Sequence, residues 1–254
     1  MSAAADLFTT GFPADPVLDI ALSHALLAGV AGGRRPAALR VFRPGPTAAF
    51  GRLDALLPGF DRACAAAREH GLTPVLRSVG GHAAIFDQRS VVVEHVTREV
   101  DATAGLQARF EDQSARVRAA LASLGADARI GELAGEYCAG AHSVNVGGRV
   151  KIAGIAQRMV RGGAATSAIV VAEGGPDLRA AVADVYGALA LPVDVATAAA
   201  LDEELPGIGV EDVRGALLEA YADVAREPGE IDAALLAAAG ALLPRHGVPV
   251  RSRT

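Results

Sequence analysis

Alternation between apolar and polar positions divides the chain into helices and short strands. Apolar side chains recur every three or four residues over 15–30, 60–70 and 106–124, the period of a helix that buries one face. Two-residue alternation, or an unbroken β-branched run, predicts strands at 38–42, 47–51, 74–77, 83–86, 90–96, 143–146, 149–160 and 164–172. The spacing does not repeat as βαβ units, so we expect an α+β fold: a mixed, largely antiparallel sheet flanked by helices.

The pattern changes after Pro192. Residues 198–206 have the composition of a linker, and helices are expected over 211–226 and 231–243. We therefore predict a main domain of residues 1–196 and a small helical C-terminal extension of residues 197–254.

A glycine pair, Gly147-Gly148, separates two of the expected strands. This dipeptide tolerates the positive φ of a type I′ turn, so the strands should form a hairpin. If the loop is those two residues alone, Lys151 lies opposite Val144.

Lys151 is the only lysine among 24 basic residues. Lysine is a compact ammonium that can lose its proton when desolvated, whereas arginine stays charged. The position therefore indicates a need that arginine cannot meet, although a solvated strand edge would explain it as well. Ala153 and Gly154, its small neighbours, leave room for a ligand above it.

Cys138 precedes Lys151 by thirteen residues and lies in a glycine-containing loop. A cysteine beside a cation is typical of a nucleophile that attacks carbonyl groups. A buried structural cysteine is the alternative, and we assign that role to Cys64 on an alanine-rich helix face. The hairpin register alone places Cys138 opposite Gln157, so the loop of residues 136–141 must fold back to reach Lys151.

A second candidate is the segment Arg77-Ser78-Val79-Gly80-Gly81 between two strands. Its glycines let backbone N–H groups approach a substrate, and Arg77 could bind an anion or a carbonyl. A plain turn between strands is the alternative.

Charge and composition narrow the function classes. The net charge is −5, and no basic cluster dominates a face, which argues against a nucleic-acid partner. There is no signal peptide pattern and no apolar run long enough to span a membrane, so we expect a cytoplasmic protein. No disulfide framework is expected from two cysteines. No metal site is expected either, because His24, His70 and His246 stand alone along the chain.

Taken together, these stretches resemble the lipoate–biotin protein ligase superfamily over roughly residues 15–225. The segment 77–81 and the strand after it resemble an Arg-x-x-Gly-Gly acyl-binding loop, and 43–52 resembles an early family segment. Residues 151–158 match a Lys-hydrophobic-small-Gly-x-Ala/Ser-Gln-Arg signature. With Tyr137-Cys138-x-Gly140 before them, they are most similar to the cysteine-dependent octanoyl-[glycine cleavage H protein]:protein N-octanoyltransferase branch.

The resemblance implies a biotin/lipoate ligase-like catalytic domain and an acyltransferase. An octanoyl or lipoyl group would pass from a carrier such as the glycine-cleavage H protein to a lysine of lipoyl domains such as 2-oxoacid dehydrogenase E2. Cys138 would form a thioester, and Lys151 would contact the acyl carbonyl and handle protons. The implied substrate-binding residues are Arg77, Gly80, Gly81, His82, Ala83, Gly154 and Gln157. No cofactor is required, a monomer is expected, and a local basic patch with Arg158 and Arg161 would receive acidic partner domains.

Two other functions remain open. One is an ATP-dependent lipoate-protein ligase that acts through an acyl-adenylate, and the other is an acyl-binding protein without activity. The family's ATP-dependent ligases usually carry a third glycine and an aromatic-His-Asp run, where this chain has His82 and Phe86-Asp87-Gln88. A branch that uses acyl carrier protein has a His-Gly pair where this chain has Arg161-Gly162. Both departures favour the amidotransferase branch.

Overall fold

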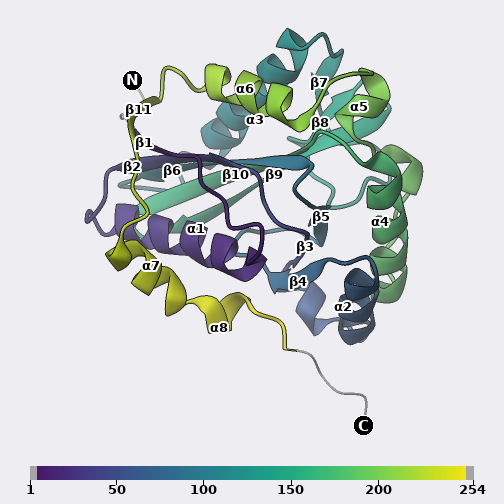
Figure 1. Ribbon diagram of the computed structural model, residues 1–254, viewed down its shortest axis with the longest axis horizontal. Coiled ribbons are helices and arrows are strands. Elements are labelled where there is room, and N and C mark those ends of the chain that lie inside the picture. The colour runs from purple at the N-terminus through teal and green to yellow at the C-terminus, as the bar shows by residue number, and fades with distance from the viewer. Residues whose placement is uncertain (1–4, 250–254) are drawn as a thin grey trace.

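The computed structural model describes residues 5–249 as two β-sheets with helices packed on them (Figure 1). The larger sheet has eight strands in the order β11-β1-β2-β6-β10-β9-β8-β7, and the smaller has the order β4-β3-β5. The strands of the larger sheet are β1 Ala5–Phe8, β2 Ala37–Phe42, β6 Ser90–Arg98, β7 Ala128–Ile130, β8 Val144–Val146, β9 Val150–Val160, β10 Gly163–Val171 and β11 Ala225–Pro228. Those of the smaller sheet are β3 Thr47–Phe50, β4 Thr73–Leu76 and β5 Ala84–Phe86.

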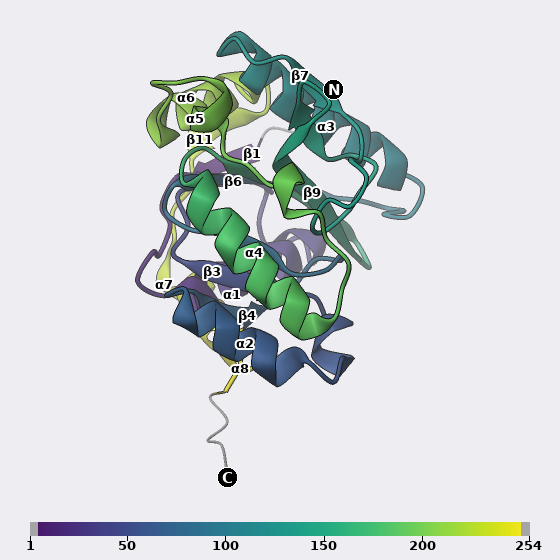
Figure 2. The same cartoon turned by 90° about the vertical axis from the view of Figure 1, so that its right-hand side faces the viewer.

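Helices cover both faces of the larger sheet, and others pack against the smaller sheet. They are α1 Pro16–Ala31, α2 Phe60–Glu69, α3 Leu106–Ser123, α4 Gly175–Leu189, α5 Leu201–Glu204, α6 Val210–Ala220, α7 Ala233–Gly240 and α8 Leu243–His246, with 3₁₀ turns η1 Asp54–Leu56 and η2 Val195–Thr197. Helices α1 and α7 pack together on one face, and α3 and α6 pack together on the other (Figure 1). Helices α2 and α4 lie side by side against the smaller sheet (Figure 2). Because most paired strands run antiparallel, the expected α+β fold is confirmed.

Local sequence explains the elements that were predicted correctly. Helix α1 begins where Asp15 accepts a hydrogen bond from the Leu18 N–H (3.0 Å) and Pro16 occupies the first turn. Strand β6 is buried over most of its length because it lies between β2 and β10.

Several elements differ from the prediction. Strands β1, β7 and β11 and helix α4 were not expected. The expected helix over 211–226 ends at Ala220, and β11 follows it. The helix over 231–243 is α7, and the separate short α8 follows it. The linker prediction for 198–206 is wrong: Ala198, Ala200 and Leu201 are buried, and Ala198 forms a β-bridge with Lys151.

The C-terminal residues are joined closely to the rest of the chain. Strand β11 pairs in parallel with β1, and α7 packs on α1. The division of the chain after residue 196 stays a prediction. Within residues 5–249, none of the helices combines the length and hydropathy that crossing a membrane requires.

Candidate active site

The hairpin of β8 and β9 brings Lys151 into the middle of the molecule. Gly147 and Gly148 have φ of 62° and 70°, and the Arg149 N–H donates to the Val146 carbonyl (3.1 Å), as the turn prediction requires. The predicted register is wrong, however. Val146 pairs with Val150, so Lys151 lies opposite Asn145. The shift arises in the turn, which leaves three residues, 147–149, unpaired instead of two; the Asn145 side chain accepts from the Gly148 N–H (3.0 Å) and stabilises it, and a second irregularity follows at Val144.

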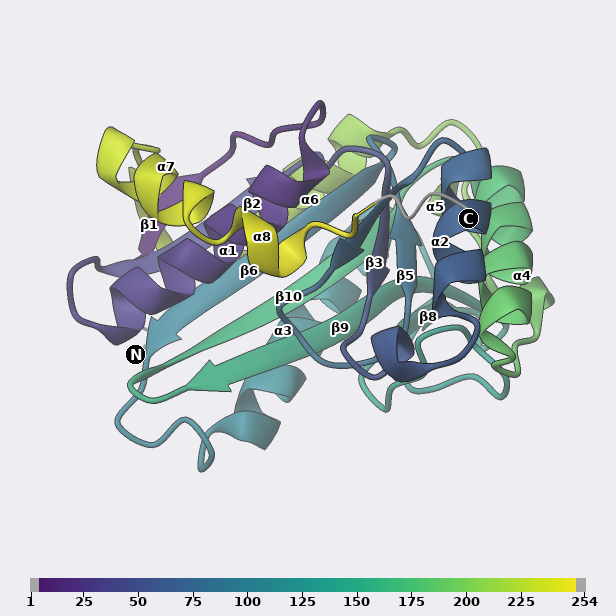
Figure 3. The same cartoon turned by 90° about the horizontal axis from the view of Figure 1, so that it is seen from below.

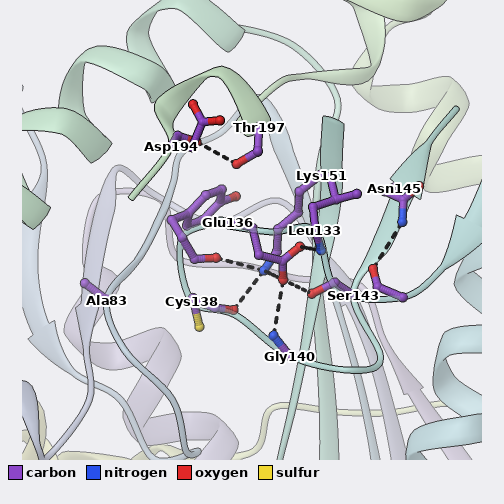
Figure 4. Close-up of polar contacts among 12 residues, drawn as sticks. Ala83, Leu133, Glu136, Cys138, Gly140, Ser143, Asn145, Lys151, Asp194 and Thr197 are labelled. Atoms are coloured by element: carbon purple, nitrogen blue, oxygen red, sulfur yellow. Dashed lines mark hydrogen bonds and ion pairs between the residues drawn. The ribbon is translucent and has the colours of Figure 1, made fainter. Parts of the chain in front are cut away.

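Lys151 is a buried cation with a full set of hydrogen bonds, and its side chain is 1% exposed. Its Nζ donates to Glu136 Oε1 (2.9 Å), the Tyr137 carbonyl (2.9 Å) and the Cys138 carbonyl (2.8 Å). An ammonium has three N–H donors, so all three bind the loop that carries Cys138 (Figure 4). The loop therefore folds back over the strand as expected, and a solvated strand edge is excluded for Lys151.

Glu136 completes this arrangement, and sequence reasoning missed it. Its Oε1 also accepts from Ser143 Oγ (2.5 Å) and the Gly140 N–H (3.2 Å), and its Oε2 accepts from the Leu133 N–H (3.0 Å). A buried ion pair persists only when such additional hydrogen bonds offset its desolvation. The available signal was a carboxylate two residues before Cys138 in an otherwise uncharged segment.

Cys138 is held at three of its atoms by three different residues. Its N–H donates to Tyr186 Oη (2.6 Å), its carbonyl accepts from Lys151, and Arg77 Nη2 donates to its Sγ (3.3 Å). Tyr186 Oη in turn donates to the Ala83 carbonyl (2.8 Å). Cys138 has a φ of 45°, which costs a non-glycine residue about 1–3 kcal/mol and is found mostly at functional sites.

The two cysteines lie in different environments. Cys138 is half-buried at a cavity, whereas Cys64 is buried on α2. Burial raises the pKa of the Cys64 thiol to about 11, so it stays protonated and unreactive near neutral pH. The structural role predicted for Cys64 agrees with this position.

Gly81 lies directly against the sulfur. Its φ is +97°, and a Cβ there would lie 2.2 Å from Arg77 Nη2 and 3.1 Å from Cys138 Sγ. No such crowding exists at Gly80. Arg77 is buried, and its Nε has no hydrogen-bond partner within residues 5–249. Only glycine therefore fits at position 81 beside the guanidinium and the thiol.

A cavity of about 340 Å³ opens beside Cys138. Gly80, Gly81 and Gln157 are among the residues that line it. The Gln157 amide accepts from Arg109 Nε (3.1 Å) and donates to the Leu106 carbonyl (2.9 Å), so α3 holds it in place.

The other predicted site residues lie around these groups. Gly154 lies beside Lys151, since a Cβ there would be 3.4 Å from Lys151 Cε. Ala83 contributes its carbonyl to Tyr186. His82 turns toward Asp54, with 2.6 Å between Nδ1 and Oδ1. The roles assigned to these residues stay predictions.

The histidines do not stand alone in space. His24 Nδ1 and His246 Nε2 are 3.0 Å apart, and His70 Nε2 is 2.7 Å from Asp184 Oδ2. These histidines are isolated along the chain, but folding brings the C-terminal segment onto α1 and α4 beside α2, and so gives each of them a partner. Among residues 5–249, no group of three or more His, Cys, Asp or Glu side chains could hold a metal ion.

Comparison with known proteins places this geometry in context. Residues 15–222 match the family model of the lipoyl protein ligase A/B catalytic domain. An octanoyl-[GcvH]:protein N-octanoyltransferase of Geobacillus kaustophilus is 33% identical over 65% of this chain and 58% of its own length. The protein of the same name from Exiguobacterium sibiricum is 34% identical over 66% of this chain and 60% of its own. A lipoyl-[GcvH]:protein N-lipoyltransferase of Listeria monocytogenes is 24% identical over 67% and 62%.

The aligned region thus spans about three fifths of the length of these curated relatives. Among solved structures, a bipartite lipoate protein ligase from Thermoplasma acidophilum superimposes with a TM-score of 0.74, at 19% identity, over 95% of this chain and 92% of that one. A lipoate-protein ligase A solved with ATP gives a TM-score of 0.68, at 19% identity, over 95% of both chains. These two structures show that the fold is shared.

Proposed function

The chain belongs to the lipoyl protein ligase A/B catalytic domain family, and from that premise we propose that it is an octanoyl or lipoyl amidotransferase. The donor is an acylated carrier resembling the glycine-cleavage H protein, and the acceptor is a lysine of a lipoyl domain such as that of 2-oxoacid dehydrogenase E2. Supporting this assignment, curated relatives carry the names of octanoyl- and lipoyl-[GcvH]:protein transferases.

The observation that carries the proposal is the set of hydrogen bonds that fixes Cys138 in position. Its backbone N–H, carbonyl and sulfur each have a separate partner, and the sulfur lies at a cavity. A nucleophile fixed in this way meets its carbonyl without losing further conformational freedom. Arg77 is a cationic partner for a sulfur anion.

The first step forms a thioester. Cys138 Sγ attacks the carbonyl carbon of the acyl-lysine amide, the sulfur–carbon bond forms, and the carbon–nitrogen bond breaks. The thiol proton leaves with the donor amine, so the products are acyl-Cys138 and a free donor lysine. In the second step the neutral acceptor lysine Nζ attacks the thioester carbonyl carbon, the carbon–nitrogen bond forms, the carbon–sulfur bond breaks, and the thiol regains the proton that the amine loses.

Each tetrahedral intermediate places negative charge on an oxygen that needs N–H donors. Arg77 donates to the sulfur, and Gly80 and Gly81 line the same cavity, so the Arg77 guanidinium and the backbone N–H groups of these glycines are the candidates for this role. All three N–H groups of the Lys151 ammonium donate hydrogen bonds to the loop in the structure. Its predicted contact with the acyl carbonyl therefore requires the exchange of one of these bonds.

Intact-mass spectrometry tests the covalent step. After incubation with an octanoylated H protein, the wild-type chain should gain one octanoyl group on Cys138, and Cys138→Ser should gain none. Cys64→Ser is the matched control and should be acylated as wild type, because the Cys64 thiol is buried and protonated. An unmodified Cys138 during active turnover would contradict the thioester route.

Lys151→Arg tests the second role. Arginine keeps the charge but does not fit the three-bond geometry of a buried ammonium, so transfer should fall about 10²–10³-fold, as for the loss of a preorganised donor. Full activity of this variant would contradict the role of Lys151.

The same proposal includes no required cofactor, a monomeric protein and a cytoplasmic location. The alternative, an ATP-dependent lipoate-protein ligase, predicts release of pyrophosphate when free lipoate or octanoate and ATP are added. We expect none.

A further inference from the structure

A second, narrower cavity lies on the other side of the Arg77–Gly81 loop. Arg77, Ser78 and Val79 line it, whereas Gly80 and Gly81 line the cavity beside Cys138. Its lining comes from the first turns of α1, from β2, β6 and β10 of the larger sheet, and from β3 and β5 of the smaller one. Helix α1 packs against β6 and β10 in this region (Figure 3). The volume of the cavity is about 40 Å³, room for only a few waters, so a chain can enter only when the wall at Ser78 and Val79 moves outward.

Paired residues on neighbouring strands connect the lining of the cavity beside Cys138 with the lining of the narrow cavity. Ala156 lines the cavity beside Cys138, and it pairs with Ser167, which lines the narrow one. Ser167 pairs with Glu94, and Glu94 pairs with Arg40. Because paired residues point to the same face of a sheet, these four positions form one row that crosses four strands, starting near the nucleophile.

The length of this row fits a medium-length acyl chain. Neighbouring strands are about 4.8 Å apart, so Ala156 and Glu94 are separated by about 10 Å. An extended eight-carbon chain measures about 9 Å from carbonyl carbon to methyl at ordinary carbon–carbon bond lengths. A chain whose carbonyl carbon lies at Ala156, in the cavity beside Cys138, and that follows the row would therefore end at β6, beside Val92 and Glu94.

At that end the row meets a buried ionic network. Arg40 is 0% exposed, and it pairs with Asp19 Oδ1 (2.9 Å) and Glu94 Oε2 (3.2 Å). Arg40 Nη1 also donates to Ser23 Oγ (2.6 Å), and Ser23 Oγ donates to the Glu94 carboxylate. Asp19 Oδ2 accepts from the Phe12 N–H (2.9 Å). Asp19 and Glu94 themselves line the cavity.

We propose that the network of Asp19, Arg40 and Glu94 is the end wall of the acyl tunnel and sets its upper chain-length limit near eight carbons. The proposal rests on the acyl transfer proposed above. An apolar wall can repack around an extra methylene, but this wall cannot move without separating buried charges from one another and from the hydrogen-bond partners that hold them. Chains longer than the row are therefore rejected instead of being accommodated.

The end wall predicts that the affinity for fatty acids stops rising at one chain length. We call that chain length the break. In an open apolar groove, affinity rises about fourfold for each added methylene. Calorimetry with hexanoate, octanoate, decanoate and dodecanoate on the Cys138→Ser protein should show that rise up to eight carbons. Beyond eight carbons affinity should fall, about 10-fold or more for decanoate.

Two variants move the wall in opposite directions. Asp19→Asn/Arg40→Met/Glu94→Ala removes all three charges together and opens space at β6, so the break should move to ten or twelve carbons. Ser167→Leu fills the row one strand earlier, so the break should move to six carbons or fewer. Thr166→Val is the matched control: Thr166 adjoins Ser167 but points to the opposite face, so the break should stay at eight.

A second measurement separates this inference from the proposed function. S-acyl-N-acetylcysteamine thioesters of six to twelve carbons are incubated with chains that retain Cys138, and acylation is followed by intact mass. The same break should appear in the acylation rates. A break in binding without any acylation would overturn the transferase proposal and support the tunnel. A break that stays at eight carbons in Ser167→Leu, or affinity that rises steadily to dodecanoate in the wild type, would overturn the end wall.

Discussion

Each main-chain polar group of Cys138, the proposed nucleophile, has its own hydrogen-bond partner, and these partners come from different elements of the fold. Lys151 comes from β9 and binds the Cys138 carbonyl, and Tyr186 comes from α4 and binds its N–H. Burial raises the pKa of Tyr186 well above its usual range, so the hydroxyl stays protonated and can donate to the Ala83 carbonyl while it accepts from Cys138. Tyr186 is therefore a positioning residue that no local sequence pattern revealed.

Tyr186→Phe tests this role. The Cys138 N–H would lose its acceptor, so we expect the acylation rate of Cys138 to fall about 10–100-fold, with an effect on kcat rather than KM. Loss of the buried hydrogen bond should also lower stability by about 1–2 kcal/mol.

Tyr221→Phe is the matched control for that variant. Tyr221 is buried as Tyr186 is, and its hydroxyl also makes one buried hydrogen bond, to Gln113 Oε1 (2.6 Å). Its hydrogen-bond partner is Gln113 and not Cys138. A similar loss of stability is expected, with acylation unchanged. Equal acylation rates in both variants would make Tyr186 merely structural.

At the scale of elements, the C-terminal α8 is tied to the loop that carries Arg77. His246 Nδ1 is 2.7 Å from the Leu76 carbonyl, one residue before Arg77, and His246 Nε2 is 3.0 Å from His24 Nδ1 on α1. Val75 and Gly247 form an antiparallel bridge beside this chain of contacts. Helices α1 and α8 and strand β4 therefore meet at two imidazoles that share one hydrogen bond.

This contact should make the fold sensitive to acid. Burial lowers the pKa of His24 from 6.5 to about 4, with Arg158, His246, Arg245 and Arg52 adding to the effect, and burial also lowers that of His246. The unfolded chain therefore binds more protons than the folded chain between about pH 4 and pH 6.5. The stabilisation is complete above pH 6.5 and is lost as the pH falls toward 4.

Thermal unfolding across that range measures the effect. The Tm of the wild type should fall steeply between pH 6.5 and 4.5, and the slope should be shallower in His24→Phe. His70→Gln, a change near the surface, is the control and should keep the wild-type slope. Parallel profiles for wild type and His24→Phe would remove His24 as the cause.

At the scale of the whole molecule, a basic cluster lies on a chain of net charge −5. Burial lowers the pKa of Arg158, and repulsion from the Arg52 and Arg245 guanidinium groups lowers it further. Arg158 Nη1 donates to the Ser78 carbonyl (2.7 Å), so Arg158 adjoins the Arg77–Gly81 loop. The basic patch of Arg158 and Arg161 stays a prediction, and Arg52 and Arg245 are two further cations whose charges act on Arg158. Arg161 lies in the turn between β9 and β10.

Docking of the proposed acceptor, an acidic lipoyl domain, near Arg158, Arg52 and Arg245 should depend on salt. For Arg245→Glu we expect the KM for the acceptor domain to rise about 10-fold at low ionic strength, with the difference shrinking as salt screens the charges. Arg118→Glu on α3 makes the same change in net charge on the opposite face of the sheet and should leave KM unchanged. An equal rise in both variants would point to net charge rather than to the cluster.

The amino-acid sequence by itself determined the elements with strong periodicity and the few residues rare enough to stand out. Helices α1, α2 and α3 and the central strands follow from local hydrophobic patterns, which depend on neighbours a few residues apart. Lys151, Cys138 and Arg77 were found because they are rare or lie beside glycine pairs. These signals are local, so they survive without knowledge of packing.

Only the tertiary structure decided which atoms meet. Glu136 pairs with Lys151, Tyr186 reaches Cys138 across 48 residues, and His24 meets His246 across 222. The one-residue shift between β8 and β9 and the row from Ala156 to Arg40 likewise depend on how strands pair. Such contacts are settled by packing and by the need of every buried polar group for a partner, and that need is met by residues distant in the chain.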